Sequence, residues 1–94
     1  MSLSTENFSK NISELIEFDY GDFMRQANYY LNRMRDELSV LHDKDINSRL
    51  STMQTYLQYA PEGGIEYTRE RLLNDTRYIE DLLRGHQQDW ESAI

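Results

Sequence analysis

The chain contains no cysteine, one proline and four glycines among its 94 residues. The absence of cysteine excludes disulfide bonds and thiolate metal sites, and it is typical of proteins from reducing compartments. Scarce proline and glycine leave few places to interrupt a helix, and no alternating Val, Ile and Thr run predicts a strand. No apolar stretch approaches the roughly 20 residues of a membrane-spanning helix, and residues 1–10 lack the apolar segment of a secretion signal. We therefore expect an all-α, soluble, cytoplasmic protein.

Basic residues are also scarce, with 10 Lys and Arg against 17 Asp and Glu, which gives a net charge of -7. This charge repels phosphate backbones and anionic lipid headgroups, so we expect no nucleic-acid or membrane partner, and we expect any charged partner to be basic. Near the N-terminus, Lys10 is the only basic residue before Arg25, among the acids Glu6, Glu14, Glu17, Asp19 and Asp22. We interpret this acidic segment as a solvated helix face, with a recognition surface as the alternative.

Apolar residues recur at the three- and four-residue steps of amphipathic helices. The three clearest stripes are Phe23, Ala27, Tyr30, Leu31, Met34, Leu38, Leu41; then Ile46, Leu50, Met53, Leu57, Ala60; and then Ile65, Leu72, Thr76, Ile79, Leu83, His86, Trp90. The residues predicted to be buried together are Ala27, Leu31, Met34, Leu38, Leu50, Met53, Leu57, Leu72, Ile79 and Leu83. Because only 38% of the residues are hydrophobic, this core should be thin.

The stripes predict helices over about residues 5–18, 20–41, 46–60 and 65–84, the last with an extension to 91, after a frayed or disordered segment 1–4. One side of the first helix carries Phe8, Ile12, Leu15 and Ile16. Short connections favour antiparallel neighbours. The predicted architecture is therefore a single domain, 1–94, forming an antiparallel up-and-down bundle of three to four helices that is completed by dimerisation.

Several local signals bear on where these helices begin and end. Asp19 can cap a new helix, yet residues before and after it also share one face of a continuous helix; we favour a break or kink. Asp45 can cap the third helix, and Gly85 suits the C-terminal cap of the fourth. The strongest turn signal is Pro61-Glu62-Gly63-Gly64.

No motif predicts catalysis or a bound cofactor. The spacing of Asp43, Asp45 and Asn47 resembles the start of a calcium loop, but the glycine and the closing glutamate of that motif are missing, so helix capping is favoured. His42 is interpreted as a residue at a helix C-terminus and His86 as a core or helix-end histidine. We expect no metal, no cofactor and no small-molecule substrate.

Tyrosines are the residues that core packing explains least well. The candidate protein interface comprises Tyr29, Arg33, Tyr59, Tyr67, Arg71, Asn74 and Tyr78. Four of these residues, from Tyr67 to Tyr78, follow one another at steps of four, three and four on the flank of the last helix. Tyr and Arg are enriched at interface hot spots. In the alternative interpretation, each Tyr covers the edge of a thin core and an Arg four residues later stacks on its ring.

Three hypotheses for the function follow. The leading one is a small, acidic, non-enzymatic interaction module that associates with itself through an isologous contact between last helices. The alternative is an acidic inhibitor or immunity-type protein that binds a basic protein surface. A remote third is an enzyme whose histidine and carboxylates converge only in the folded protein.

Overall fold

The computed structural model describes residues 3–59 and 63–93, with side chains described for 4–59 and 63–86. Within these ranges the chain forms four α-helices and one short 3₁₀ helix: α1 (Leu3–Glu14), α2 (Tyr20–Leu38), η1 (Ser39–Leu41), α3 (Lys44–Gln58) and α4 (Gly64–Ala93). No strand occurs in the part of the chain that is described. The predicted all-α fold is therefore confirmed.

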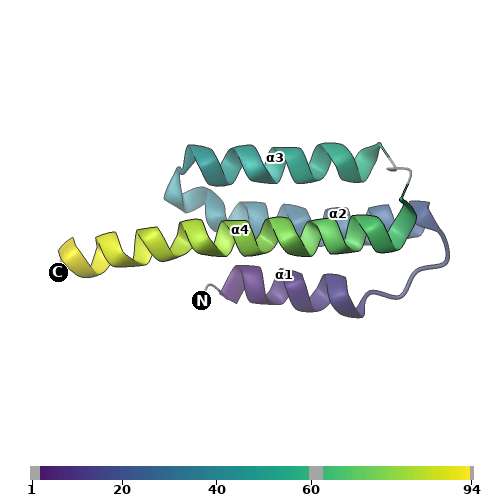
Figure 1. Cartoon of the computed structure of the whole chain (residues 1–94), viewed down its shortest axis with the longest axis horizontal. Helices are drawn as coiled ribbons and strands as arrows, with labels where there is room; N and C mark the ends of the chain where they lie inside the picture. The colour runs from purple at the N-terminus through teal and green to yellow at the C-terminus, as the bar shows by residue number, and fades with distance from the viewer. Residues whose placement is uncertain (1–2, 60–62, 94) are drawn as a thin grey trace.

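The helices form a bundle in which successive helices lie side by side and reverse direction (Figure 1). Helices α1 and α3 each pack against both α2 and α4, and α2 also contacts α4. The fold measures 48 × 22 × 19 Å. Its length comes from α4, because a helix of 30 residues is about 45 Å long. The C-terminal part of α4 extends beyond the ends of the other helices (Figure 1).

All ten residues predicted to be buried together lie in one hydrophobic cluster. Helix α1 adds Phe8 and Ile12 to this cluster, and Leu15 joins it from the first residue after the helix. Thr76 is also buried, and its hydroxyl donates a hydrogen bond of 2.7 Å to the Leu72 carbonyl, so no polar group is left unpaired there. Most of the described members of the apolar stripes are thus buried within one chain, and Tyr30, Leu41 and Ile65 are partly buried against the same cluster.

Residues 15–19 separate α1 from α2, so the favoured break is present. Asp19 caps α2, because its side chain accepts a hydrogen bond of 2.8 Å from the backbone N–H of Asp22. The prediction that Ile16 lies on the apolar side of the first helix is wrong, since Ile16 is 88% exposed. The helical periodicity that placed it there ends at Glu14.

Other boundaries differ from the predicted ones by a few residues. Residues 3 and 4 belong to α1, whereas residues 1–2 of the segment expected to fray lie outside the described residues. Helix α2 ends at Leu38, and the predicted continuation to 41 is the 3₁₀ helix η1. Asp43 caps α3 in place of Asp45, accepting hydrogen bonds of 2.8 and 3.0 Å from the backbone N–H groups of Asp45 and Ile46. The predicted end of that helix at Ala60, and Pro61 and Glu62 of the turn, lie outside the described residues.

Of the two alternatives for the last helix, a cap at Gly85 is wrong and the extension to about 91 is right, because α4 continues through Gly85 to Ala93. A glycine inside a helix costs about 1 kcal/mol relative to alanine. The next residue, His86, contacts Asp43 at the start of α3, so this part of α4 packs beside that helix end. The side chain of Trp90, the end of the predicted stripe, lies outside the described side chains.

Candidate protein interface

The predicted flank of α4 lies beside α3 and remains partly open to solvent. Tyr67 is 50% exposed and Tyr78 is 45% exposed, and Arg71 and Asn74 between them are exposed as well. Tyr67, Arg71 and Asn74 line one shallow hollow together with Glu70. The structure therefore brings the four predicted α4 residues onto one continuous surface, as a single helix must.

Two arginines of this region stack on tyrosines across the α3–α4 contact. The Arg71 guanidinium lies 4.0 Å from the centre of the Tyr56 ring, and that of Arg49 lies 4.1 Å from the centre of the Tyr78 ring. A cation over an aromatic face is attracted by the ring quadrupole. The alternative interpretation of the tyrosines is thus partly right, but each stacked pair joins two helices and is not formed within one.

Asp75 of α4 connects this region to α3 through two polar contacts. Its carboxylate accepts a hydrogen bond of 2.9 Å from the Tyr56 hydroxyl and forms an ion pair of 3.1 Å with Arg49. The Asp75 side chain is only 15% exposed. Burial, and secondarily the hydrogen bond to Asp75, raises the pKa of Tyr56, which keeps its hydroxyl protonated as a donor. We call Arg49, Tyr56 and Asp75 the Asp75 network.

Charge is not balanced across this surface. Asp75 neutralises Arg49, whereas Arg71 forms no ion pair with any carboxylate among the described residues. Glu70, the adjacent residue in the hollow, forms no ion pair within the described part either. Asn74 accepts a hydrogen bond of 3.0 Å from Arg77. The flank therefore presents one acid and one base, next to each other, that the described fold leaves without a charged partner.

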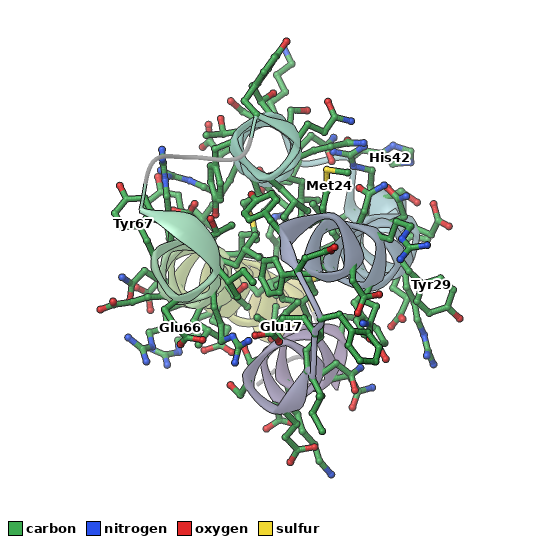
Figure 2. All side chains as sticks on the ribbon, turned by 90° about the vertical axis from the view of Figure 1, so that its right-hand side faces the viewer. Glu17, Met24, Tyr29, His42, Glu66 and Tyr67 are labelled. Carbon is green, nitrogen blue, oxygen red and sulfur yellow. The ribbon has the colours of Figure 1, made fainter. Side chains whose placement is uncertain are left out.

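The other three predicted interface residues lie elsewhere. Tyr29 is 64% exposed on α2 and packs edge-on against Tyr30, with ring centres 5.4 Å apart. Arg33, one turn later, pairs with Glu37 at 3.5 Å. Figure 2 shows Tyr29 and Tyr67 on opposite sides of the bundle. Tyr59 follows the end of α3 and is 79% exposed. The seven residues therefore do not form a single surface.

The acidic residue Asp43 has a structural role at the start of α3. Asp43 caps α3 and its other carboxylate oxygen contacts Nε2 of His86. Of the two expected roles of His86, the structure is nearer to the hydrogen-bonded core histidine than to the helix-end one, because the side chain is half-buried and lies inside α4, which continues to Ala93. His42 adopts a left-handed backbone conformation, with φ of 51°, at the end of η1. Among the described residues, no group of three or more His, Cys, Asp or Glu side chains converges on a position that could hold a metal ion.

The contacts of Asp43 lead to a prediction about how the free energy of unfolding changes in acid. Its hydrogen bond from the Ile46 N–H, and next its bond to His86, lowers the pKa of Asp43 below 3.8. A lowered carboxyl pKa adds stability that is present above the unfolded-state pKa of about 3.9 and is lost as the pH falls through the folded-state value. We expect the fall in the free energy of unfolding between about pH 5 and about pH 3 to be smaller in Asp43→Asn, which keeps a capping group, than in the wild type.

Urea titrations at the two pH values measure this difference. Asp45→Asn is the matched control, because Asp45 lies in the same first turn but is exposed and caps nothing. If Asp43→Asn loses as much stability on acidification as the wild type does, the assignment to Asp43 is wrong.

Comparison of the chain with protein-family models, curated proteins and solved structures finds no match. Among the described residues, no helix is both long and apolar enough to cross a bilayer. The cytoplasmic location remains a prediction. Functional inference therefore depends on the surfaces described above and on one that sequence reasoning missed, the pair Ile16 and Phe18 between α1 and α2.

Proposed function

We propose that the protein is a non-enzymatic interaction module that associates with itself through the α4 flank, Tyr67, Arg71, Asn74 and Tyr78. The observation that carries the proposal is the exposure of this flank beside a core that is buried within one chain. The ten residues at the centre of the apolar stripes are buried within one chain without Tyr67 and Tyr78, which remain half-exposed. Residues of this type beside an unpaired arginine are typical of interface hot spots.

An isologous contact between two α4 helices would satisfy the unpaired charges. In such a contact each surface meets its own copy, so that if residue i touches residue j of the partner, then residue j touches residue i. Arg71 of one chain can then pair with Glu70 of the partner subunit, and the same pair forms twice. This pairing offsets locally the repulsion that a net charge of -7 creates between two copies. In this proposal, dimerisation joins two complete antiparallel bundles.

Charge exchange at these two positions tests the proposal. We expect Glu70→Arg and Arg71→Glu each to weaken association about tenfold or more, because each places like charges opposite one another. The double variant, Glu70→Arg with Arg71→Glu, should regain most of the lost affinity. Sedimentation velocity over a range of concentrations measures all four proteins.

Arg33→Glu provides the matched control, since Arg33 is exposed on α2, away from the flank. It should associate as the wild type does. A wild-type chain that stays monomeric at high concentration would contradict the proposal and leave binding to a basic protein as the favoured function. Failure of the double variant to recover would rule out the Glu70–Arg71 pairing.

A further inference from the structure

The linker between α1 and α2 exposes two large apolar side chains. Ile16 is 88% exposed and Phe18 is 99% exposed, the two highest values among the large apolar residues that the structure describes. Single exposed apolar residues are common on protein surfaces. A pair two residues apart, one of them aromatic, is a stronger sign of an interaction surface.

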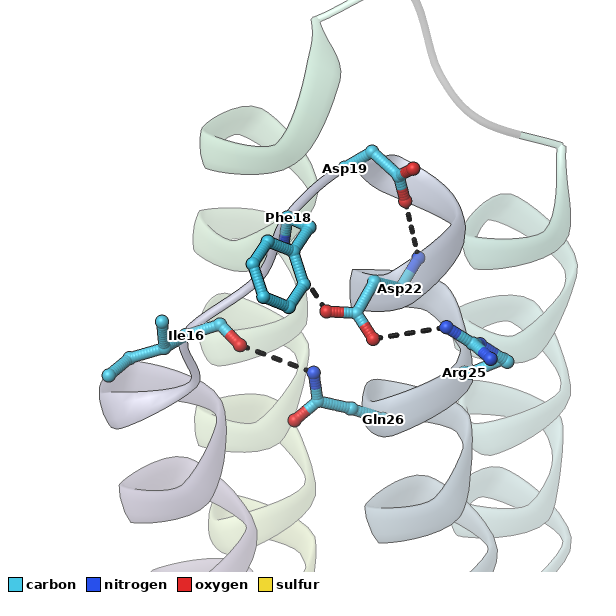
Figure 3. Close-up of polar contacts among 6 residues, drawn as sticks. All are labelled: Ile16, Phe18, Asp19, Asp22, Arg25 and Gln26. Carbon is cyan, nitrogen blue, oxygen red and sulfur yellow. Dashed lines mark hydrogen bonds and ion pairs between the residues drawn. The ribbon is translucent and has the colours of Figure 1, made fainter.

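Hydrogen bonds fix the backbone that carries this pair (Figure 3). The Ile16 carbonyl accepts a hydrogen bond of 3.2 Å from Nε2 of Gln26, and the Phe18 N–H donates one of 3.2 Å to the Asp22 carboxylate. Asp22 is itself oriented by Arg25, at 3.1 Å.

Between the two apolar residues, Glu17 anchors the linker to α4. Its carboxylate pairs with Arg69 at 2.8 Å, and both side chains are largely buried, at 17% and 16% exposed. The linker is thus attached to both α2 and α4, while the Ile16 and Phe18 side chains remain exposed. A surface ordered before binding loses little conformational freedom when a partner docks.

The charge around this pair indicates what kind of partner fits. Residues 11–24 contain four acids and no Lys or Arg. Glu17 and Asp22 are engaged by Arg69 and Arg25, whereas Glu14 and Asp19 are exposed and form no ion pair with any described residue. The apolar pair is therefore flanked by two exposed carboxylates. Glu14 is free of ion pairs, and Asp19, whose Oδ1 caps α2, can approach a basic group through its other oxygen.

We propose that Ile16 and Phe18 form a docking site for a segment of another protein that carries apolar residues flanked by Lys or Arg. Apolar side chains of that segment cover Ile16 and Phe18, and its basic residues reach Glu14 and Asp19. A second copy of this chain fits less well, because the same carboxylates would oppose each other, and an anionic membrane surface is repelled for the same reason. This site is separate from the α4 flank and does not depend on self-association.

Selection of short random peptides displayed on phage, with the whole 94-residue chain as bait, tests the proposal. The enriched peptides are expected to combine apolar residues with Lys or Arg and to bind more weakly as salt is raised. Phe18→Ser and Ile16→Ser should each weaken binding of a synthetic copy of the best peptide about tenfold or more. Circular dichroism and thermal unfolding should not change, since neither side chain packs against the core.

Val40→Ser is the matched control. Val40 is also an exposed aliphatic residue, at 74%, but it lies in η1 and not in the linker. It should leave peptide binding unchanged. The proposal is overturned if no peptide is enriched, if the enriched peptides lack basic residues, or if the two linker variants bind them as the wild type does.

Two further measurements test whether a second copy of the chain, or a membrane, covers Ile16 and Phe18 instead. If Phe18→Ser abolishes self-association in sedimentation velocity, the surface is covered by a second copy and the proposal fails. It fails equally if the wild type, but not Phe18→Ser, binds phosphatidylcholine vesicles in flotation, because the apolar pair would then serve a membrane.

Discussion

Replacing Leu57 or Ile79 by alanine is expected to lower the free energy of unfolding by about 2 to 5 kcal/mol. Both side chains are fully buried, Leu57 on α3 and Ile79 on α4, and both belong to the single hydrophobic cluster. Truncation removes apolar contacts and leaves a cavity that neighbouring helices fill only in part. Since a domain has about 5 to 15 kcal/mol of stability in total, this loss is a large part of what the fold can have.

Chemical denaturation measures this loss as a lower midpoint with an unchanged m-value. Val40→Ala is the control, because it removes aliphatic carbon from a side chain that is 74% exposed. Its free energy of unfolding should stay within about 0.5 kcal/mol of the wild type. An unmoved midpoint in Leu57→Ala or Ile79→Ala would mean that the residue does not lie in the core.

The core could be predicted from the sequence because helical periodicity is a local property. Leu31, Leu50 and Ile79 each repeat with apolar neighbours three or four residues away, and only one face of each helix can then be buried. Helix ends were less predictable. The apolar Leu41 continues the stripe of α2, yet the chain already follows 3₁₀ geometry from Ser39, and Gly85 remains helical where a cap was expected.

The candidate interface was predictable only in so far as it lies on one helix. Steps of four, three and four place Tyr67 and Tyr78 on a common flank whatever the rest of the fold does. The stacking of Arg71 on Tyr56 depends on how α3 and α4 dock, which no local spacing encodes. Exposure of Ile16 was missed because it depends on where α1 stops, and the apolar pattern continues past that point.

Removal of the Asp75 carboxylate is expected to be the most destabilising change outside the hydrophobic core. In Asp75→Ala, the Tyr56 hydroxyl and the Arg49 guanidinium lose their shared acceptor. Both partners lie against the α3–α4 contact, and a buried or half-buried polar group without a partner costs the energy of its lost hydration. Because one of the two bonds is an ion pair, we expect a loss of about 1.5 to 3 kcal/mol in the free energy of unfolding.

Asp81→Ala is a close control for this change. Asp81 also lies on α4 and also pairs with an arginine, Arg84, at 3.1 Å, but its side chain is 69% exposed. Exposed ion pairs of this kind contribute about 1 kcal/mol or less. The two variants therefore differ mainly in burial, and equal midpoints in a urea titration would show that the Asp75 network adds nothing to stability.

Tyr56→Phe separates the two parts of the loss, because it removes only the hydroxyl and keeps the ring on which Arg71 stacks. We expect it to cost about 1 kcal/mol, the usual contribution of one hydrogen bond, and so less than Asp75→Ala.

Asp75→Ala also affects the α4 flank. It releases Arg49, which stacks on Tyr78, and it removes the hydrogen bond that orients Tyr56, on which Arg71 stacks, so Tyr78 and Arg71 both lose support. If this flank is the self-association surface, Asp75→Ala should weaken association under conditions in which the monomer is still folded. Tyr56→Phe should leave it nearly unchanged.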